Sequence, residues 1–209
     1  MLITFTPKLA MRFFPNLWSR FLFFSFGVRL HIDGEPKDHV PAIYASNHAS
    51  PLDIPVSFLT TPGGGYFISK KELKKIPVFG WYMTLSGMIF IDRSNKDTAM
   101  KSMLSAGEEV KKGKNVIAYP EGTRSKDGEM MRFKRGSFLL SKETNIPIQL
   151  SVINGAFDRM TSKDWQCQPG IIQFKYLDKI SWDGSKYQSP EDYANQTQQV
   201  VAKAYSEMA

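Results

Sequence analysis

Alternation of strand-like and helix-like segments is the feature that most constrains the fold of this chain. Short runs of apolar and β-branched residues recur from residue 28 onward, and amphipathic helical patterns lie between several of them. Strands that alternate with helices build a largely parallel sheet with helices packed on its faces. The strand-like runs are Val28–Ile32, Ala42–Ala45, Tyr66–Ser69, Met88–Ile91, Val116–Tyr119, Ile148–Val152 and Ile171–Tyr176.

The length of 209 residues is enough for one such domain and too short for two full ones. We therefore predict a single-domain α/β sandwich around a mixed, largely parallel sheet of about seven strands. Helices are expected over about residues 95–112, around Phe138–Leu140, and after Ser189. At the last of these, Ser189 is the expected cap and Pro190 the expected first helical residue.

Residues 1–27 differ from the rest of the chain in composition. Aromatic residues crowd this segment, four cations precede Asp33, and no acidic residue does. Apolar side chains recur every four residues in two adjacent helical rows, and Lys8, Arg12 and Arg20 fall in a third row largely opposite. The rows are Leu9, Phe13, Leu17 and Phe21, and Ala10, Phe14, Trp18, Leu22 and Phe26.

This pattern predicts an amphipathic helical membrane anchor over residues 1–27, in one or two helices that lie in the membrane surface. No run reaches the ~18 apolar residues of a spanning helix, and interrupting charges fit a cleaved signal peptide poorly. Pro7 and Pro15 are expected to begin or kink helical pieces. The alternative is an ordinary helix packed on the domain.

The charge balance narrows the choice of partner. The net charge is +7, which favours an anionic partner: nucleic acid, a phosphorylated substrate or lipid headgroups. One cysteine, Cys167, excludes a disulfide framework. The histidines are His31, His39 and His48, in no metal-ligand spacing, so no metal is expected.

A candidate catalytic pair follows the second strand-like run, in the segment Asn47 to Asp53. The strand is followed by a helix start, with Ser50 as cap and Pro51 at the first helical position. A histidine in that turn and an aspartate in the first helical turn could meet, and an Asp–His pair is what a general base requires. The alternative is that Asp53 completes a capping box with Ser50 and that His48 is an ordinary turn residue.

Three further segments carry polar groups at or near strand ends. Gly87–Arg93 ends in an acid–base pair, which could also be a surface salt bridge. Tyr119–Ser125 supplies a carboxylate, a glycine and an arginine, and Arg124 could grip a phosphate or be solvated. The lysine-rich run Ser69–Lys75 could be an anion-binding site or the solvent-exposed face of a short helix.

These segments, in this order, resemble the motifs of the glycerolipid acyltransferase family, and most closely its bacterial 1-acylglycerol-3-phosphate acyltransferases. The resemblance covers roughly residues 25–155 and includes Lys70–Leu73 with Pro77 and Gly80, and the stretch Phe133–Gly136. The match is weakest in Asn145–Val152, where Leu150 occupies a position at which a second proline is common. That departure leaves the acyl-chain side of the site less well defined.

The resemblance implies a function and a set of site residues. An enzyme of this family moves a fatty acyl group from a thioester donor, acyl-CoA or acyl carrier protein, to the sn-2 hydroxyl of lysophosphatidate. It implies an acyltransferase domain over residues 28–209, no cofactor beyond the thioester, and membrane lipid as partner at the cytoplasmic face of the inner membrane. It also implies catalytic roles for His48 and Asp53, and substrate-binding roles for Asn47, Lys70, Arg93, Glu121, Gly122, Thr123 and Arg124, the cations serving the acceptor's phosphate.

Three other functions are compatible with parts of the sequence. Another lyso-lipid could be the acceptor. A serine hydrolase is disfavoured because no G-x-S-x-G motif occurs and Ser50 is a poor nucleophile candidate. A nucleic-acid-binding module fits the charge, but no recognised binding motif is present, so we expect no nucleic-acid partner.

Overall fold

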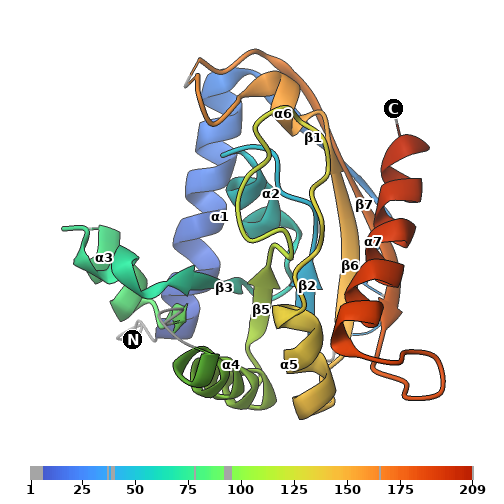
Figure 1. The fold of residues 1–209 in the computed structure, drawn as a ribbon. Coiled ribbons are helices and arrows are strands. Elements are labelled where there is room, and N and C mark those ends of the chain that lie inside the picture. The colour runs from blue at the N-terminus through green and yellow to red at the C-terminus, as the bar shows by residue number, and fades with distance from the viewer. Residues whose placement is uncertain are drawn as a thin grey trace.

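Seven strands form one sheet in the computed structural model, which describes residues 7–36, 38, 41–77, 79–91, 96–164 and 166–208 (Figure 1). The strand order is β1-β7-β6-β2-β5-β3-β4. Every neighbouring pair is parallel except β6 and β7, so the predicted mixed, largely parallel sheet is confirmed. The strands are β1 (Val28–Asp33), β2 (Ile43–Ala45), β3 (Gly65–Lys70), β4 (Ile89–Ile91), β5 (Asn115–Ala118), β6 (Ile148–Asn154) and β7 (Gly170–Ile180).

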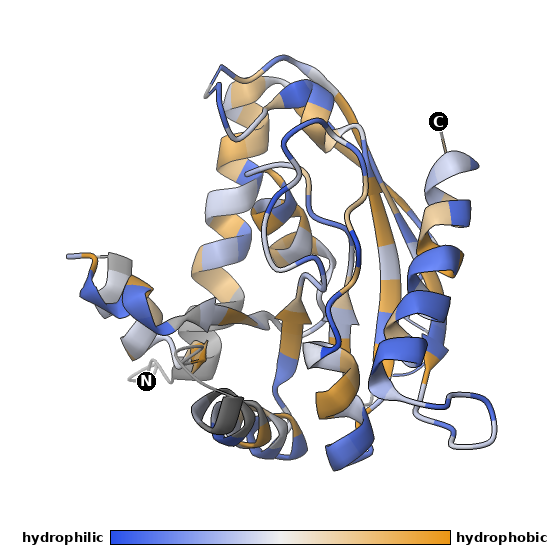
Figure 2. Ribbon diagram, viewed as in Figure 1, coloured by the Kyte–Doolittle hydropathy of each residue, from blue (hydrophilic) through white to orange (hydrophobic). Residues whose placement is uncertain are grey.

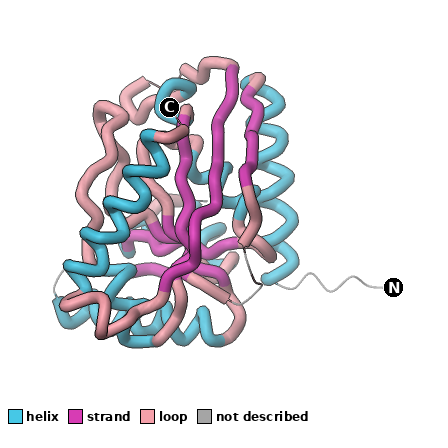
Figure 3. Tube along the Cα trace, turned by 90° about the vertical axis from the view of Figure 1, so that its right-hand side faces the viewer, coloured by secondary structure: helices cyan, strands magenta, loops and turns pink. Residues whose placement is uncertain are grey.

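Each strand corresponds to one of the seven predicted runs. The largest difference is β7, which extends to Ile180 although the sequence pattern ends at Tyr176. The extension has a physical reason, because the far end of β7 pairs with the start of β6, where Ile180 lies opposite Ile148. The strands in Figure 3 run in markedly different directions, as the accumulated right-handed twist of a wide sheet requires.

The predicted helices are present. Lys96–Lys111 matches the expected helix over 95–112, and Ser189 caps the last helix by accepting a hydrogen bond from the Asp192 N–H at 3.1 Å. The helices are α1 (Pro7–Phe26), α2 (Asp53–Thr60), the 3₁₀ helix η1 (Lys71–Lys75), α3 (Phe79–Leu85), α4 (Lys96–Lys111), α5 (Gly136–Thr144), α6 (Ala156–Arg159) and α7 (Pro190–Ser206).

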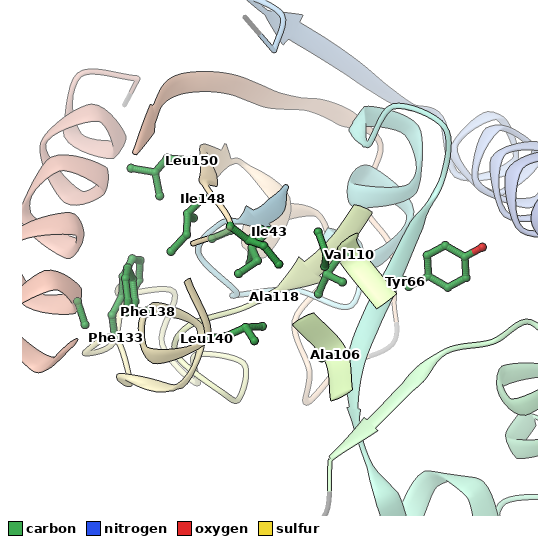
Figure 4. Close-up of a cluster of buried hydrophobic side chains, with 14 of the residues drawn as sticks. Ile43, Tyr66, Ala106, Val110, Ala118, Phe133, Phe138, Leu140, Ile148 and Leu150 are labelled. Carbon is green, nitrogen blue, oxygen red and sulfur yellow. The ribbon is translucent and has the colours of Figure 1, made fainter. Parts of the chain in front are cut away.

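The helices cover the two faces of the sheet and bury two large cores, beside a small cluster of Ala42, Tyr44 and Ile117. The larger core joins β2, β5 and β6 to α4, α5 and α7, with Phe138, Leu140 and Tyr193 among its fully buried side chains (Figure 4). The second core joins β1, β6 and β7 to α1, α2 and α6. This two-faced burial is the sandwich that the alternating sequence pattern predicts.

The first helix packs on the domain through a row of side chains that the sequence pattern did not single out. α1 is one continuous helix that contains Pro15, and it lies against α2. Pro15, Ser19 and Phe23, four residues apart, face inward, and Phe23 is 5% exposed. In Figure 2 apolar residues are spread along this helix although it lies at the outside of the molecule. None of the helices in the described part of the chain is long and apolar enough to cross a bilayer.

The two predicted apolar rows of α1 are largely exposed instead. Phe24, next to the buried Phe23, is 86% exposed. Phe24 belongs to neither row, and the exposed members of the rows are Phe13, Phe14, Leu17, Trp18, Phe21 and Phe26. The helix therefore uses a narrow face to pack on α2 and leaves a broad aromatic face uncovered by the rest of the described chain.

Candidate functional site

The site forms where β2 and β5 end side by side. Ala45 at the end of β2 pairs with Ala118 at the end of β5. Because the two strands are parallel, the loops that follow them leave the same edge of the sheet, which is where α/β folds place ligands. A hydrogen bond from the Ser125 N–H to the His48 carbonyl, 2.9 Å, ties the two loops together.

His48 and Asp53 are in direct contact. The distance from His48 Nδ1 to Asp53 Oδ2 is 2.8 Å, and the two side chains are 12% and 1% exposed. The same oxygen accepts the N–H groups of Ala49 and Ser50, each at 2.8 Å. The predicted contact between His48 and Asp53 is therefore present. The Ser50 N–H binds the same carboxylate oxygen, but α2 begins at Asp53 and not at the predicted Pro51, and Leu52 rather than Ser50 is at its cap position.

This arrangement fixes the state of the imidazole ring. A carboxylate on Nδ1 favours the tautomer that carries the proton there, so Nε2 keeps the lone pair. The main-chain donors from Ala49 and Ser50 hold the carboxylate in place on the folded loop. The ring is thus oriented as a general base requires.

Tyr119 stacks on the imidazole ring, a contact that the sequence patterns did not reveal. The two ring centroids lie 3.8 Å apart and the planes differ by 6°. The Tyr119 hydroxyl donates to the Asp53 carbonyl at 2.8 Å and lies 2.8 Å from Ser57 Oγ. Burial raises the pKa of Tyr119 well above its usual value, so the phenol stays neutral. A neutral aromatic face against the ring stabilises an imidazolium when one forms. The signal available from sequence was an aromatic residue directly after β5.

Glu121 holds the histidine loop in place rather than lining the cavity. Its side chain is 2% exposed; Oε1 accepts the His48 N–H at 2.8 Å, and Oε2 accepts the Met131 N–H at 3.1 Å. Burial raises its pKa to about 7. The carboxylate that the sequence placed near the substrate thus connects two loops behind it.

Asn47 is likewise bound to main chain. Its Nδ2 donates to the Ile153 carbonyl and its Oδ1 accepts the Ile153 N–H, both at 2.8 Å, and the residue is 4% exposed. The paired bonds extend the contact between the β2 end and β6. Asn47 therefore orients the loop that carries His48, and its amide is occupied by β6.

A large cavity opens beside the His48–Asp53 pair. Its volume is about 1060 Å³, and its lining is mainly apolar, from α1, α2, β3 and α3. His48 and Tyr119 line it, and so do the predicted substrate-binding residues Gly122, Thr123 and Arg124. An oriented histidine, an arginine and an apolar wall thus line one cavity.

The turn at position 122 requires a glycine. Its φ is +74°, and a Cβ there would lie 2.8 Å from Lys134 Nζ. The group that approaches this glycine closely within the protein is thus the Lys134 side chain, whereas the sequence pattern suggested only a ligand. Of the other predicted cations, Lys70 ends β3 with its side chain outside the described residues, and Arg93 lies wholly outside them.

Ser50 is unsuited to act as a nucleophile. Its side chain is 0% exposed and donates a hydrogen bond to the Met160 carbonyl at 2.6 Å. Its Oγ also accepts the Leu52 N–H at 3.1 Å. The serine-hydrolase alternative thus has no support at this residue.

Known proteins are similar to this chain in sequence. The model of the Acyltransferase family matches residues 28–153. A 1-acyl-sn-glycerol-3-phosphate acyltransferase of Limnanthes douglasii is 33% identical over 179 residues, covering 85% of this chain and 64% of that protein. An enzyme of the same name from Pseudomonas aeruginosa is 33% identical over 173 residues, covering 78% of this chain and 65% of that protein. The chain thus spans just under two thirds of the length of these relatives.

The fold is also similar to a solved structure. The crystal structure of the 1-acyl-sn-glycerophosphate acyltransferase PlsC from Thermotoga maritima superposes with a TM-score of 0.80 at 27% sequence identity. The match covers 97% of this chain and 80% of that one. The region matched by the family includes β1 to β6 and every residue of the loops around His48 and Glu121. The chain belongs to the acyltransferase family.

Proposed function

We propose that this chain is a 1-acylglycerol-3-phosphate O-acyltransferase, which moves a fatty acyl group from a thioester to the sn-2 hydroxyl of lysophosphatidate and gives phosphatidate. The observation that carries the proposal is the 2.8 Å contact of Asp53 with His48, where His48 and Arg124 line the same mainly apolar cavity. The names of the similar enzymes support the same acceptor.

His48 acts as the general base in this proposal. The acceptor hydroxyl has a pKa far above 7 and is a weak nucleophile, so Nε2 removes its proton as the oxygen attacks the thioester carbon. Asp53 on Nδ1 and the face of Tyr119 stabilise the imidazolium that results. General-base assistance of this kind contributes about 10²–10⁴ in rate. Collapse of the tetrahedral intermediate breaks the C–S bond, and His48 returns the proton to the departing thiolate.

The oxyanion of that intermediate needs a hydrogen-bond donor, and Thr123 supplies it in this proposal. The N–H groups of His48 and Gly122 already donate, to Glu121 and to the Tyr119 carbonyl. Thr123 lines the cavity between Gly122 and Arg124, in the same turn. Thr123 is exposed, so its main-chain N–H becomes an effective donor to the oxyanion once bound substrate displaces solvent from the cavity.

The acceptor's phosphate end lies against Arg124 in this proposal. A guanidinium can bind a phosphate through two parallel hydrogen bonds, and such charge-assisted bonds contribute about 1.5–3 kcal/mol each. The apolar remainder of the cavity suits a fatty acyl chain. Lys70 and Arg93 are proposed to assist at the phosphate. The acyl donor is acyl-CoA or acyl carrier protein, and the enzyme acts at the cytoplasmic face of the inner membrane with α1 in its surface.

Acyl-transfer assays on the purified protein test the proposal. We expect thiol release from an acyl thioester that depends on added lysophosphatidate, and both donors are to be offered. Arg124→Ala is expected to lower kcat/KM for lysophosphatidate by about tenfold to a hundredfold, with a smaller loss on a zwitterionic lysophospholipid. Arg132→Ala is the matched control, because Arg132 borders a separate basic pocket with Arg135 and Glu191. Equal losses on both acceptors would assign Arg124 to the fold or the donor. No acceptor-dependent thiol release with either donor would reject the proposed activity.

A further inference from the structure

Two apolar surfaces border the cavity, and only one of them belongs to α1. The exposed aromatic face of α1 contributes Leu17, Trp18 and Phe21 to the lining. The other border is formed by η1 and α3, which contribute Leu73, Tyr82 and Met83. Figure 1 shows α3 projecting from the body of the molecule. The cavity thus lies between two helical segments that both reach the surface.

α3 presents a second set of apolar side chains that the cavity does not use. Trp81 is 65% exposed and Leu85, four residues later, is 78% exposed. Residues four apart lie on the same side of a helix, so the two form one patch. Ile76, directly after η1, is 43% exposed and lies beside α3, because its carbonyl accepts the Gly80 N–H at 2.7 Å. A tryptophan and a leucine that are this exposed on a folded domain are typical of an interaction surface.

The charged residues beside this patch indicate which kind of partner the patch binds. η1 has the sequence Lys-Glu-Leu-Lys-Lys, so exposed Lys71, Lys74 and Lys75 accompany a single acid, Glu72. Cations flanking an exposed tryptophan and aliphatic side chains match the interface of an anionic bilayer, where the ammonium groups meet headgroups and the apolar groups enter the acyl boundary. A protein partner would need a complementary contour, whereas a bilayer accepts a projecting convex helix.

We propose that the η1–α3 surface, defined by Lys75, Ile76, Trp81 and Leu85, is a second membrane-contacting element, separate in sequence from α1. With both elements on the bilayer, the cavity mouth opens against lipid on two sides. A lyso-lipid then passes from the bilayer into the cavity without crossing water. The inference rests on the proposed function only for what enters the cavity, because membrane contact is measurable without any reaction.

Vesicle binding of the full chain tests this surface. We expect Trp81→Ser with Leu85→Ser to weaken partitioning to phosphatidylglycerol–phosphatidylcholine vesicles by about tenfold. Lys75→Ala is expected to weaken binding to those vesicles and leave binding to pure phosphatidylcholine unchanged. The matched control is Leu104→Ser with Val200→Ser, which removes two exposed apolar side chains from α4 and α7. Partitioning of the Trp81/Leu85 variant equal to that of this control would overturn the proposal.

A second measurement does not require a variant that has lost vesicle binding. Leu85→Cys in a Cys167→Ser background carries an environment-sensitive dye, and its emission is expected to shift to the blue when anionic vesicles are added. The same dye at Val200→Cys is expected not to shift. No shift at position 85 while the protein is vesicle-bound would mean that α1 alone contacts the membrane. If acyl transfer fails but the dye shifts, the proposed reaction is wrong and this surface assignment stands.

Discussion

One carboxylate oxygen, Asp53 Oδ2, accepts the hydrogen bonds that hold the site together. Oδ2 of Asp53 binds His48 Nδ1 and the N–H groups of Ala49 and Ser50, all at 2.8 Å. The sequence left two interpretations of Asp53 open, a catalytic partner and a helix-start carboxylate. They are compatible, because an ionised carboxylate oxygen has room for several donors. The loop geometry and the orientation of the base therefore depend on the same atom.

Replacing either member of the pair tests the general-base assignment. His48→Ala is expected to lower kcat by at least about a hundredfold, since the proton acceptor is lost. Asp53→Asn is expected to be about as severe, because an amide N–H facing Nδ1 stabilises the tautomer with its proton on Nε2. His31→Ala, on the exposed edge strand β1, is the matched control and is expected to retain activity. Steady-state kinetics on folded protein measure this, and a His48→Ala enzyme of near wild-type rate would exclude the mechanism.

The raised pKa of Glu121 predicts that the stability of the protein depends on pH. Burial raises its pKa to about 7 in the folded protein, whereas its ordinary value is 4.5. Between these values the unfolded chain is ionised and the folded chain keeps the proton, so the free energy of unfolding falls as pH rises from about 4.5 to about 7. Below the window both forms are protonated, and above it both are ionised.

Glu121→Gln removes this titration and keeps one oxygen acceptor. We expect the variant to be less stable than the wild type at pH 5 and the difference to shrink by pH 7.5, since only the wild type then bears a buried charge. Urea unfolding at a series of pH values measures both curves. Parallel curves would show that the Glu121 carboxyl does not titrate in this range.

At the scale of elements, α1 packs on the domain as one of the two interpretations of its sequence predicted, while its contact with a membrane stays a prediction. The helix lies against α2 with Pro15, Ser19 and Phe23 buried, as an ordinary docked helix does. Its predicted apolar rows stay outside and line the cavity or face solvent. The sequence pattern predicted the exposed rows because they are long and aromatic. It missed the docking row because that row is a proline, a serine and one phenylalanine, and small residues allow close helix packing without a hydrophobic signal.

Two adjacent phenylalanines on α1 test which face of the helix is buried and which is exposed. Phe23 is 5% exposed and Phe24 is 86% exposed. Phe23→Ala is expected to lower the free energy of unfolding by about 3–5 kcal/mol, the usual cost of a cavity left by a phenylalanine. Phe24→Ala is expected to change it by less than about 0.5 kcal/mol but to weaken vesicle binding. Denaturant titration and vesicle sedimentation of the two variants measure this, and equal stability losses would contradict the orientation of the helix.

At the scale of the whole molecule, strand order decides which predicted residues meet. The sequence predicted the seven strands and the polar groups at or near several of their ends, because hydrophobic period and turn residues are local signals. It did not predict that β2 lies beside β5, since pairing between distant strands leaves no local pattern. The stacking of Tyr119 on His48 and the Glu121 bond to the histidine loop depend on that adjacency, and so they became visible only in the fold.

The neighbours of β2 in the sheet, β5 on one side and β6 on the other, explain the structural contacts of two predicted substrate-binding residues. Asn47 and Glu121 lie beside the reactive pair in sequence or space, but their polar atoms are engaged with Ile153, His48 and Met131. A motif shows which residues a site requires and does not show whether each faces the ligand or supports its neighbour. Mutation of either residue is therefore expected to act through the position of His48.

Deleting residues 1–26 distinguishes a membrane tether from an integral part of the fold. α1 covers the second core, where Phe23 packs with Leu52 and Val56, and it forms part of the cavity wall. We expect the deletion to lower the free energy of unfolding by more than Phe23→Ala does, because the whole docking face is lost. We also expect reduced activity on a short-chain acceptor dispersed in detergent, where no membrane contact is needed. Urea unfolding and detergent-based kinetics measure the two effects. A deletion variant with unchanged stability and unchanged activity in detergent would mean that the segment is a tether alone, and that residues 28–209 form the catalytic unit without it.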